Sequence, residues 1–221
     1  MNTLTSQHER RLLKRGIDMI NLTDDLFLGD GNHKIVYAHP TDKALCVKLL
    51  RTPDDPDFAK EMRYRKALGS RADSMTLLTK YFGEVETSKG KGYLFERVLD
   101  YDGKISQTML NVLDDTARDK KLLPATENLW LDFKRAYFNE RFLLAGVDPD
   151  NYLVQRISPN ERRVRIIDNI GIATFVPLPY YFDYFALKRV KKYWARFIDL
   201  LRTDYGQIFD EDFLRKLAEI E

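Results

Sequence analysis

The segment DPDNYLVQRISPNERRVRIID, residues 148–168, restricts the possible folds of this chain more than any other. Two runs of strand-forming residues flank the turn-forming SPNER, which predicts an antiparallel hairpin. Asn151 precedes the first strand and Asp168 ends the second, so a hairpin of this length brings both residues to the same end. Amide and carboxylate oxygens are hard ligands that suit a hydrated divalent cation such as Mg²⁺. The alternative is two unrelated turn caps, because Asn and Asp both bond their own backbone in turns.

Composition limits the classes of protein that the chain can belong to. Its 221 residues include 36 basic and 34 acidic ones, for a net charge of +2, so binding to nucleic acid or a membrane surface is not expected without a local patch. No apolar run approaches the roughly 20 residues that a membrane-spanning helix needs, and the first 20 residues do not resemble a signal peptide. The single cysteine, Cys46, excludes an internal disulfide and fits a reducing compartment, so we expect a cytoplasmic protein.

The pattern of apolar residues changes near residue 101. Before it, short strand-like runs over 25–29, 34–40, 45–50, 81–87 and 93–100 surround one helical pattern over 58–69, after a weakly amphipathic segment over 1–20. After it, helical spacing covers 106–115, 126–146 and 180–221, interrupted by the hairpin. The sequence therefore predicts an α+β protein with two compact lobes, a β-rich one over 1–100 and a helical one over 101–221.

Lys48 is placed unusually, in the apolar strand LCVKLL. A lysine in such a run either reaches solvent, which burial statistics alone favour, or points towards an anion. Glu61 follows 13 residues later on the predicted helix and by itself is an ordinary exposed residue. As a pair, a strand lysine followed by a helix glutamate is the arrangement that holds lysine against nucleotide phosphates.

Gly29 and Gly31, in GDGNHK between the first two strands, give a weaker signal. Glycines at this position let a backbone approach phosphate oxygens closely. A plain hairpin turn explains them equally well, because Asp-Gly is itself a strong turn signal. The segment is not a Walker loop, since it lacks Gly-Lys-Ser/Thr and no helix follows it.

The order of these features is that of a protein-kinase fold: glycine turn, strand lysine, helix glutamate, hairpin asparagine and strand-end aspartate. The strings YAHPTDKALCVKLL, EMRYRKAL, DYDGK, DPDNYLV, DNIGIATFVPLP and LKRVKKYWARFI together resemble the YrbL family, which is named as part of the PhoP regulatory network. The resemblance runs from about residue 26 to residue 198. It implies a protein-kinase-like fold and a site for ATP and Mg²⁺.

The same resemblance implies a role for each matching residue. Lys48 and Glu61 would be the phosphate-positioning pair, with Gly29 and Gly31 in the loop before them. Asn151 and Asp168 would be the metal ligands. Residues 95–98, with Glu96 and Val98, would form the hinge whose backbone groups meet the adenine.

The sequence departs from an active kinase at two positions. The catalytic base is expected five residues before Asn151, where this chain has Gly146. Asp148 and Asp150 are close but out of register, and either could replace the base or merely cap the turn. The expected Asp-Phe-Gly is Asp168-Asn169-Ile170-Gly171, longer by one residue.

Three functions remain open on the sequence alone. The chain could be an atypical kinase acting on a small molecule, a sugar or a protein, or a pseudokinase that binds ATP without transferring phosphate. It could also be a non-catalytic interaction module that binds a phosphate-bearing or acidic partner through a basic helix. That helix carries Lys188, Arg189, Lys191, Lys192 and Arg196, although a solvated face of an amphipathic helix is the commoner explanation of such a pattern.

Overall fold

The computed structural model describes residues 19–173 and 176–219, so the amphipathic segment expected near the N-terminus lies outside the described residues except for its last two positions. Backbone contacts divide the described chain into two compact units. Unit 1 runs to Asp55 and includes Lys80–Arg97, whereas unit 2 comprises Pro56–Thr79 and everything from Val98 onwards. The lobes expected over 1–100 and 101–221 differ from this division, because the segment 56–79 groups with unit 2.

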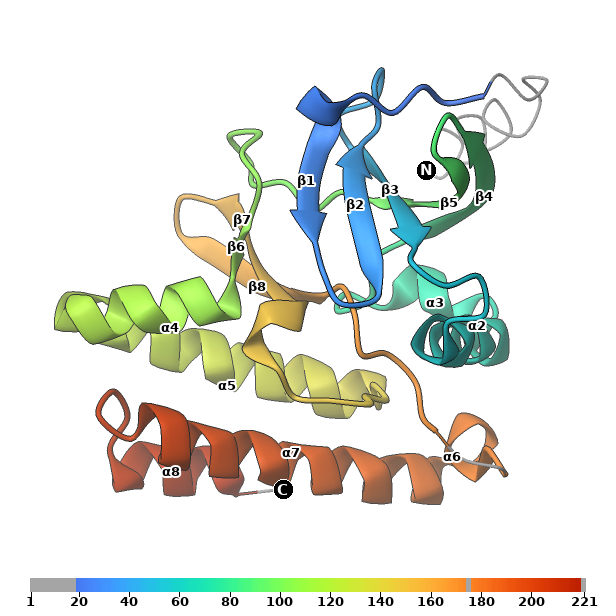
Figure 1. Cartoon of the computed structure of the whole chain (residues 1–221). Coiled ribbons are helices and arrows are strands. Elements are labelled where there is room, and N and C mark those ends of the chain that lie inside the picture. Colours follow the sequence, from blue (N-terminus) through green and yellow to red (C-terminus); the bar gives the residue numbers. More distant parts are fainter. Residues whose placement is uncertain (1–18, 174–175, 220–221) are drawn as a thin grey trace, which may run out of the picture. The chain divides into compact units, whose positions relative to one another are not determined.

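Unit 1 is an antiparallel sheet of five strands in the order β1-β2-β3-β5-β4. The strands are β1 (Phe27–Asp30), β2 (Lys34–Ala38), β3 (Leu45–Leu50), β4 (Tyr81–Thr87) and β5 (Gly90–Glu96), preceded by the short helix η1 (Asp24–Leu26) (Figure 1). Apolar side chains from β2, β3 and β5 build its core, including Tyr37, Val47 and Leu94. The runs of β-branched and aromatic residues fit this arrangement, because such side chains pack well on a pleated surface.

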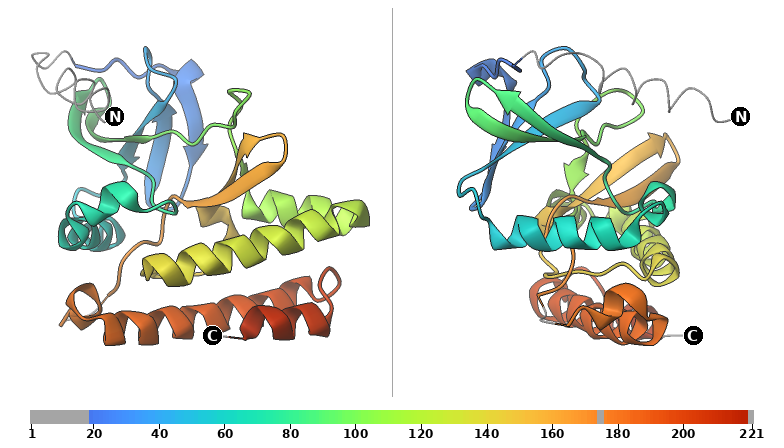
Figure 2. Two further views of the ribbon diagram at one scale, coloured as in Figure 1. Left: turned by 180° about the vertical axis from the view of Figure 1, so that it is seen from behind. Right: turned by 90° about the vertical axis from the view of Figure 1, so that its right-hand side faces the viewer.

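Unit 2 is mainly helical and contains a second, three-stranded sheet in the order β6-β7-β8. Its helices are α2 (Pro56–Leu68), α3 (Arg71–Ser74), α4 (Met109–Arg118), η2 (Lys120–Leu122), α5 (Leu123–Glu140), η3 (Pro149–Asn151), α6 (Leu178–Tyr181), α7 (Asp183–Tyr205) and α8 (Glu211–Ala218). Its strands are β6 (Gln107–Thr108), β7 (Tyr152–Ser158) and β8 (Glu161–Ile166). Helices α7 and α8 lie side by side next to α5 (Figure 2).

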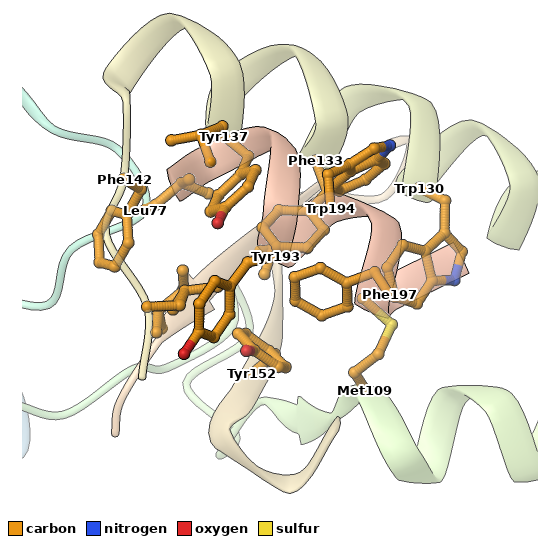
Figure 3. Close-up of a cluster of buried hydrophobic side chains, with 14 of the residues drawn as sticks. Leu77, Met109, Trp130, Phe133, Tyr137, Phe142, Tyr152, Tyr193, Trp194 and Phe197 are labelled. Atoms are coloured by element: carbon orange, nitrogen blue, oxygen red, sulfur yellow. The ribbon is translucent and has the colours of Figure 1, made fainter. Parts of the chain in front are cut away.

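An aromatic cluster between α5 and α7 forms the core of unit 2 (Figure 3). Phe133 lies at its centre, with its ring 5.7 Å from that of Trp194 and 5.5 Å from that of Phe197. Trp130 and Tyr152 extend the cluster, and edge-on contacts between rings dominate. Rings of this size supply most of the buried apolar area in a core, and edge-on pairs add specific stabilisation.

Two helices end earlier than the sequence predicts. The helix expected over 126–146 ends at Glu140, because Arg141 takes a left-handed conformation with φ of 49° and closes the helix. The helix expected over 180–221 is interrupted after Tyr205 and restarts at Glu211, where the Asp210 side chain accepts a hydrogen bond from the Phe213 amide. A left-handed residue ends a helix, and a capping side chain begins a new one, even where the apolar spacing continues.

The fold prediction is confirmed at the level of class. The chain is α+β, with one unit built on an antiparallel sheet and one unit that is mainly helical. Within residues 19–173 and 176–219, no helix is both long and apolar enough to cross a bilayer.

Candidate functional site

The hairpin of β7 and β8 brings Asn151 and Asp168 to the same end of unit 2. Tyr152 pairs with Ile166 in the strand register, and the Ile167 amide donates a hydrogen bond of 3.0 Å to the Asn151 carbonyl. Asn151 is the last residue before β7, and Asp168 follows β8 by two residues. The expected juxtaposition is therefore present, and the end of the hairpin carries one amide and one carboxylate that suit a hydrated divalent cation.

The loop after Asp168 is fixed by its backbone. Asn169 has φ of 57°, a left-handed conformation that Asn tolerates better than most residues, and its amide donates to Asp168 Oδ1 over 2.8 Å. The Asn169 carbonyl accepts from the Ala145 amide over 2.7 Å, and the Gly171 amide donates to the Leu143 carbonyl over 2.8 Å. The segment 143–145 thus anchors both sides of the loop that presents Asp168.

Gly146 leaves space that the carboxylate of Asp148 occupies. A Cβ atom at residue 146 would lie 2.9 Å from Asp148 Oδ2 and 2.7 Å from Asn169 Nδ2. These two atoms form a hydrogen bond of 2.8 Å, in which the Asn169 amide donates to Asp148. The Asp148 carboxylate therefore lies beside Gly146. It can do so because residue 146 has no side chain.

The other candidate for this position, Asp150, has a different environment. It lies close enough to Tyr205 to act on the phenol, whose pKa is raised first by burial and then by nearby carboxylates that include Asp150. The backbone at Gly146 is also fixed by Tyr152, because the Tyr152 hydroxyl donates a hydrogen bond of 2.9 Å to the Gly146 carbonyl. Of the two acids that the sequence left open, Asp148 is the one beside Gly146.

Helix α2 packs directly against this loop. A Cβ atom at Gly171, where φ is 90°, would lie 2.8 Å from the Lys60 carbonyl oxygen on α2. The Tyr64 hydroxyl, also on α2, accepts a hydrogen bond of 3.2 Å from the Leu143 amide. Only glycine combines this backbone angle with so close an approach, so α2 and the loop after Asp168 form one packed body.

Glu61 on α2 is buried, with 1% of its surface exposed. Its Oε1 atom accepts two hydrogen bonds from Arg65, of 2.8 Å from Nε and 2.6 Å from Nη2. Arg65 also donates to the Thr79 carbonyl over 2.8 Å, while Glu61 Oε2 has no hydrogen-bond partner among the described residues. The pairing of Arg65 with Glu61 was not predicted from the sequence, although a spacing of four residues on a helix was a sufficient signal.

Lys48 lies in β3 of unit 1, between β2 and β5, and is paired with Val36 and Tyr93. Only 7% of its surface is exposed, and its ammonium nitrogen lies 4.2 Å from the centre of the Phe95 ring. Such a contact attracts a cation through the negative face of the ring. The solvent-exposed side chain that burial statistics favoured is therefore wrong for Lys48.

The glycines of the first turn show no conformational need for glycine. Gly29 belongs to β1 and Gly31 to the turn, where its amide bonds the Lys34 carbonyl over 2.9 Å. A Cβ atom would meet nothing within 4 Å at Gly29 and only the Lys34 carbonyl, at 3.6 Å, at Gly31. These two positions fit an ordinary hairpin, and a role towards phosphates remains a prediction.

The expected hinge residues fall on either side of the boundary between the units. Glu96 ends β5, and its carboxylate accepts from the Lys80 amide over 3.0 Å. The Glu96 carbonyl lies 3.7 Å from the Cys46 thiol, and the Val98 carbonyl accepts from the Ser106 amide over 3.3 Å. Both carbonyls thus already have one partner.

Comparison with known proteins agrees with the motifs. The model of the family described as "PhoP regulatory network protein YrbL" matches residues 20–202. The chain belongs to the YrbL family. Two curated members, the YrbL proteins of Escherichia coli strain K12 and Shigella flexneri, are each 32% identical over 183 residues, which is 81% of this chain and 87% of theirs. The region of this chain that matches the YrbL family model contains every candidate residue from Gly29 to Asp168.

A solved structure, the kinase domain of BubR1, aligns with 82% of this YrbL-family chain and 60% of its own chain. Its TM-score is 0.47 and its sequence identity is 16%.

Proposed function

We propose that this YrbL-family protein binds ATP together with magnesium. The observation that carries the proposal is the meeting of Asn151 and Asp168 at one end of the β7–β8 hairpin, with Asp148 on the adjoining loop. Both ligand side chains are partly exposed and offer oxygen donors, which is the chemistry that Mg²⁺ prefers. A bound magnesium ion would neutralise charge on the nucleotide phosphates.

In this proposal Lys48 and Glu61 both serve the phosphate site. On Glu61 the buried Oε2 atom lacks a hydrogen-bond partner among the described residues, while Arg65 occupies Oε1. A buried carboxylate oxygen without a partner costs about 1–3 kcal/mol or more, which favours a cation at this atom. Gly29 and Gly31 would lie near the phosphates, and the backbone of Glu96 and Val98 near the adenine.

The proposal concerns the binding of ATP first and the transfer of phosphate second, because Gly146 occupies the position of the usual catalytic aspartate. If phosphoryl transfer occurs, an acceptor hydroxyl attacks the γ-phosphorus, the bond to the bridging oxygen of ADP breaks, and the hydroxyl proton passes to Asp148. Most catalysis of this reaction comes from positioning and charge neutralisation. A general base contributes only about 10²–10⁴-fold, so a chain with a poorly placed base would still bind nucleotide as a pseudokinase.

A second candidate is a non-catalytic regulatory module, in keeping with the family description as a PhoP regulatory network protein. Lys188, Lys191, Lys192 and Arg196 are exposed on α7 and could meet a phosphate-bearing or acidic partner. Arg189 is not part of that surface, because its guanidinium donates to the Leu144 carbonyl and the Tyr193 hydroxyl. Trp194 and Phe197 face the core, as an amphipathic helix requires.

A thermal shift experiment tests the nucleotide proposal. Ligand at 100 times its dissociation constant stabilises the folded state by about 2.7 kcal/mol, which corresponds to a rise in Tm of roughly 5–10 °C for a chain of this size. ATP with magnesium should produce this shift in the wild type and in Asp150→Ala, a control in the same loop. Asp168→Ala should abolish it. A folded wild-type protein without an ATP-dependent shift would favour the regulatory module instead.

Transfer itself is tested with γ-labelled ATP. Asp148→Asn should lower the transfer of label by about 10²–10⁴-fold while leaving the thermal shift intact, because a base contributes to rate and not to nucleotide affinity. Asp150→Asn is the matched control. Wild-type protein that shifts with ATP but transfers no label to any tested acceptor would be a pseudokinase.

A further inference from the structure

A cavity in unit 2 lies outside the residues of the proposed nucleotide site. Its volume is about 400 Å³. Its walls come from the C-terminal half of α2, from residue 172 and from the segment 177–181, and consist of Arg63, Lys66, Ala67, Ile172, Pro177, Tyr180 and Tyr181. Helices α2 and α6 are in contact within unit 2 (Figure 1). A concave space of this size is large enough to receive a side chain or a small ligand.

The polar groups of the cavity wall are cationic or neutral. Arg63 and Lys66 are both exposed and lie one turn apart on α2, and none of the described residues that line the cavity is a carboxylate. The Tyr180 hydroxyl is fixed in place because it accepts a hydrogen bond of 3.0 Å from the Ile172 amide, and burial raises its pKa, so it remains protonated. This wall suits a carboxylate that enters beside an apolar group.

An adjoining hollow of about 40 Å³ extends the same charge. Arg71 and Arg141 contribute to its wall, together with Tyr180 and Tyr181, which it shares with the larger cavity. Within the part of the chain that the structure describes, Asp183 is the single acidic residue of the two walls, and its carboxylate is 3.1 Å from Arg141 in an ion pair. The surface formed by the two hollows is therefore positively charged.

Next to the cavity, aromatic side chains are exposed in an unusual concentration. Tyr181, Phe182 and Tyr184 have 69%, 55% and 72% of their surfaces exposed. Phe185 joins them, with its ring 5.3 Å from that of Tyr184 and 6.3 Å from that of Phe182. Contiguous exposed aromatics next to arginine are typical of protein interfaces, where such residues are enriched.

We propose that this surface binds an acidic polypeptide segment of a partner protein. One apolar or aromatic side chain of the segment enters the cavity, and carboxylates near it pair with Arg63 and Lys66. The charge of the surface excludes a basic segment, and its concavity argues against a lipid bilayer, whose flat surface leaves a cavity of this volume unfilled. The rings of Tyr181 and Phe182 cover the backbone of the bound segment.

Fluorescently labelled poly(Glu,Tyr), measured by anisotropy without nucleotide, is the probe. The double variant Arg63→Glu/Lys66→Glu should weaken binding by roughly tenfold or more, because each reversal replaces an attraction with a repulsion. The matched control is Arg118→Glu/Lys121→Glu, an exposed pair with the same residue types and the same spacing elsewhere in unit 2. This control should keep wild-type affinity.

Two further arms complete the test. Tyr181→Ser removes an exposed ring without changing the charge and should also weaken binding, and polyglutamate without tyrosine should bind less tightly than poly(Glu,Tyr). Equal loss in the Arg118/Lys121 control would show unspecific charge attraction and overturn the proposal. Unchanged binding in both Tyr181→Ser and the Arg63/Lys66 variant would do the same. Tighter binding to vesicles containing phosphatidylglycerol than to the copolymer would assign the surface to membranes.

Discussion

Gly146 and Gly171 provide a sharp test of how the loop at Asp168 is built. At both positions a Cβ atom would be crowded, at 2.7 Å from Asn169 Nδ2 for Gly146 and at 2.8 Å from the Lys60 carbonyl for Gly171. The neighbours differ in kind, because the first is the end of a side chain that can move and the second is helix backbone. Of these two glycines, only Gly171 has a positive φ, of 90°. We therefore expect the same substitution to have different consequences at the two sites.

For Gly171→Ala two costs add. A left-handed residue with a Cβ atom costs about 1–2 kcal/mol, and forcing extra volume against fixed backbone costs about 1–3 kcal/mol. The lower entropy of the unfolded alanine chain offsets about 0.4–1 kcal/mol. The free energy of unfolding should therefore fall by about 1–5 kcal/mol.

For Gly146→Ala the clash is relieved by moving the Asp148 and Asn169 side chains apart. The cost is their hydrogen bond, about 0.5–1.5 kcal/mol, and the same unfolded-state term offsets much of it. The free energy of unfolding should change by less than about 1 kcal/mol. Since Asp148 moves, transfer of label from ATP should fall even though the protein stays folded.

Urea unfolding followed by tryptophan fluorescence measures these differences. The two tryptophans of the chain, Trp130 and Trp194, are both buried in the core of unit 2, so the signal reports this unit. Gly103→Ala is the control for backbone conformation alone, since Gly103 has φ of 80° and a Cβ atom there would meet nothing within 4 Å. Equal losses for Gly171→Ala and Gly103→Ala would refute the close approach of α2. A loss at Gly146 as large as that at Gly171 would refute the distinction between movable and fixed neighbours.

Two further predictions concern titratable groups. Burial by itself would raise the pKa of Asp100, but hydrogen bonds from Ser106 and Arg156 outweigh burial and lower it, so its stabilising effect is present above the ordinary value of 3.8 and is lost as the pH falls below it. Asp100→Asn should therefore destabilise unit 2 at pH 7 and make progressively less difference in urea titrations below about pH 4; a difference that does not change with pH would contradict this reasoning. Burial raises the pKa of the Cys46 thiol, so Cys46 should react slowly with a thiol reagent in the native protein and rapidly in urea. Rapid native labelling, followed by absorbance, would show that β3 is not buried as described.

Local patterns in the sequence were sufficient for much of the fold. The strand containing Lys48 and the hairpin between Asn151 and Asp168 were predictable, because alternation and turn residues act over a few positions. The helix carrying Glu61 was predictable from its apolar spacing. The segment 141–146, by contrast, retains helical spacing although the left-handed Arg141 ends the helix, and spacing does not record such a backbone angle.

The elements that carry the candidate residues were predictable, and the contacts of these residues were less so. The sequence could not decide between Asp148 and Asp150, because the choice depends on how the loop after Gly146 turns. Burial statistics for Lys48 alone favoured solvent, while its pairing with Glu61 favoured an anion, and the contact with the Phe95 ring was not predicted because Phe95 lies far away in the sequence. The pair of Glu61 and Arg65 needed only helical spacing and was overlooked.

Under the proposed function, the end of the β7–β8 hairpin binds a magnesium–nucleotide complex. Titration calorimetry with a non-hydrolysable ATP analogue, with and without magnesium, measures this binding directly. We predict saturable heat with one ligand per chain that requires magnesium, disappears in Asp168→Ala and persists in Asp150→Ala. Binding that is unchanged in Asp168→Ala, or the absence of any heat from folded wild-type protein with magnesium present, would contradict the account.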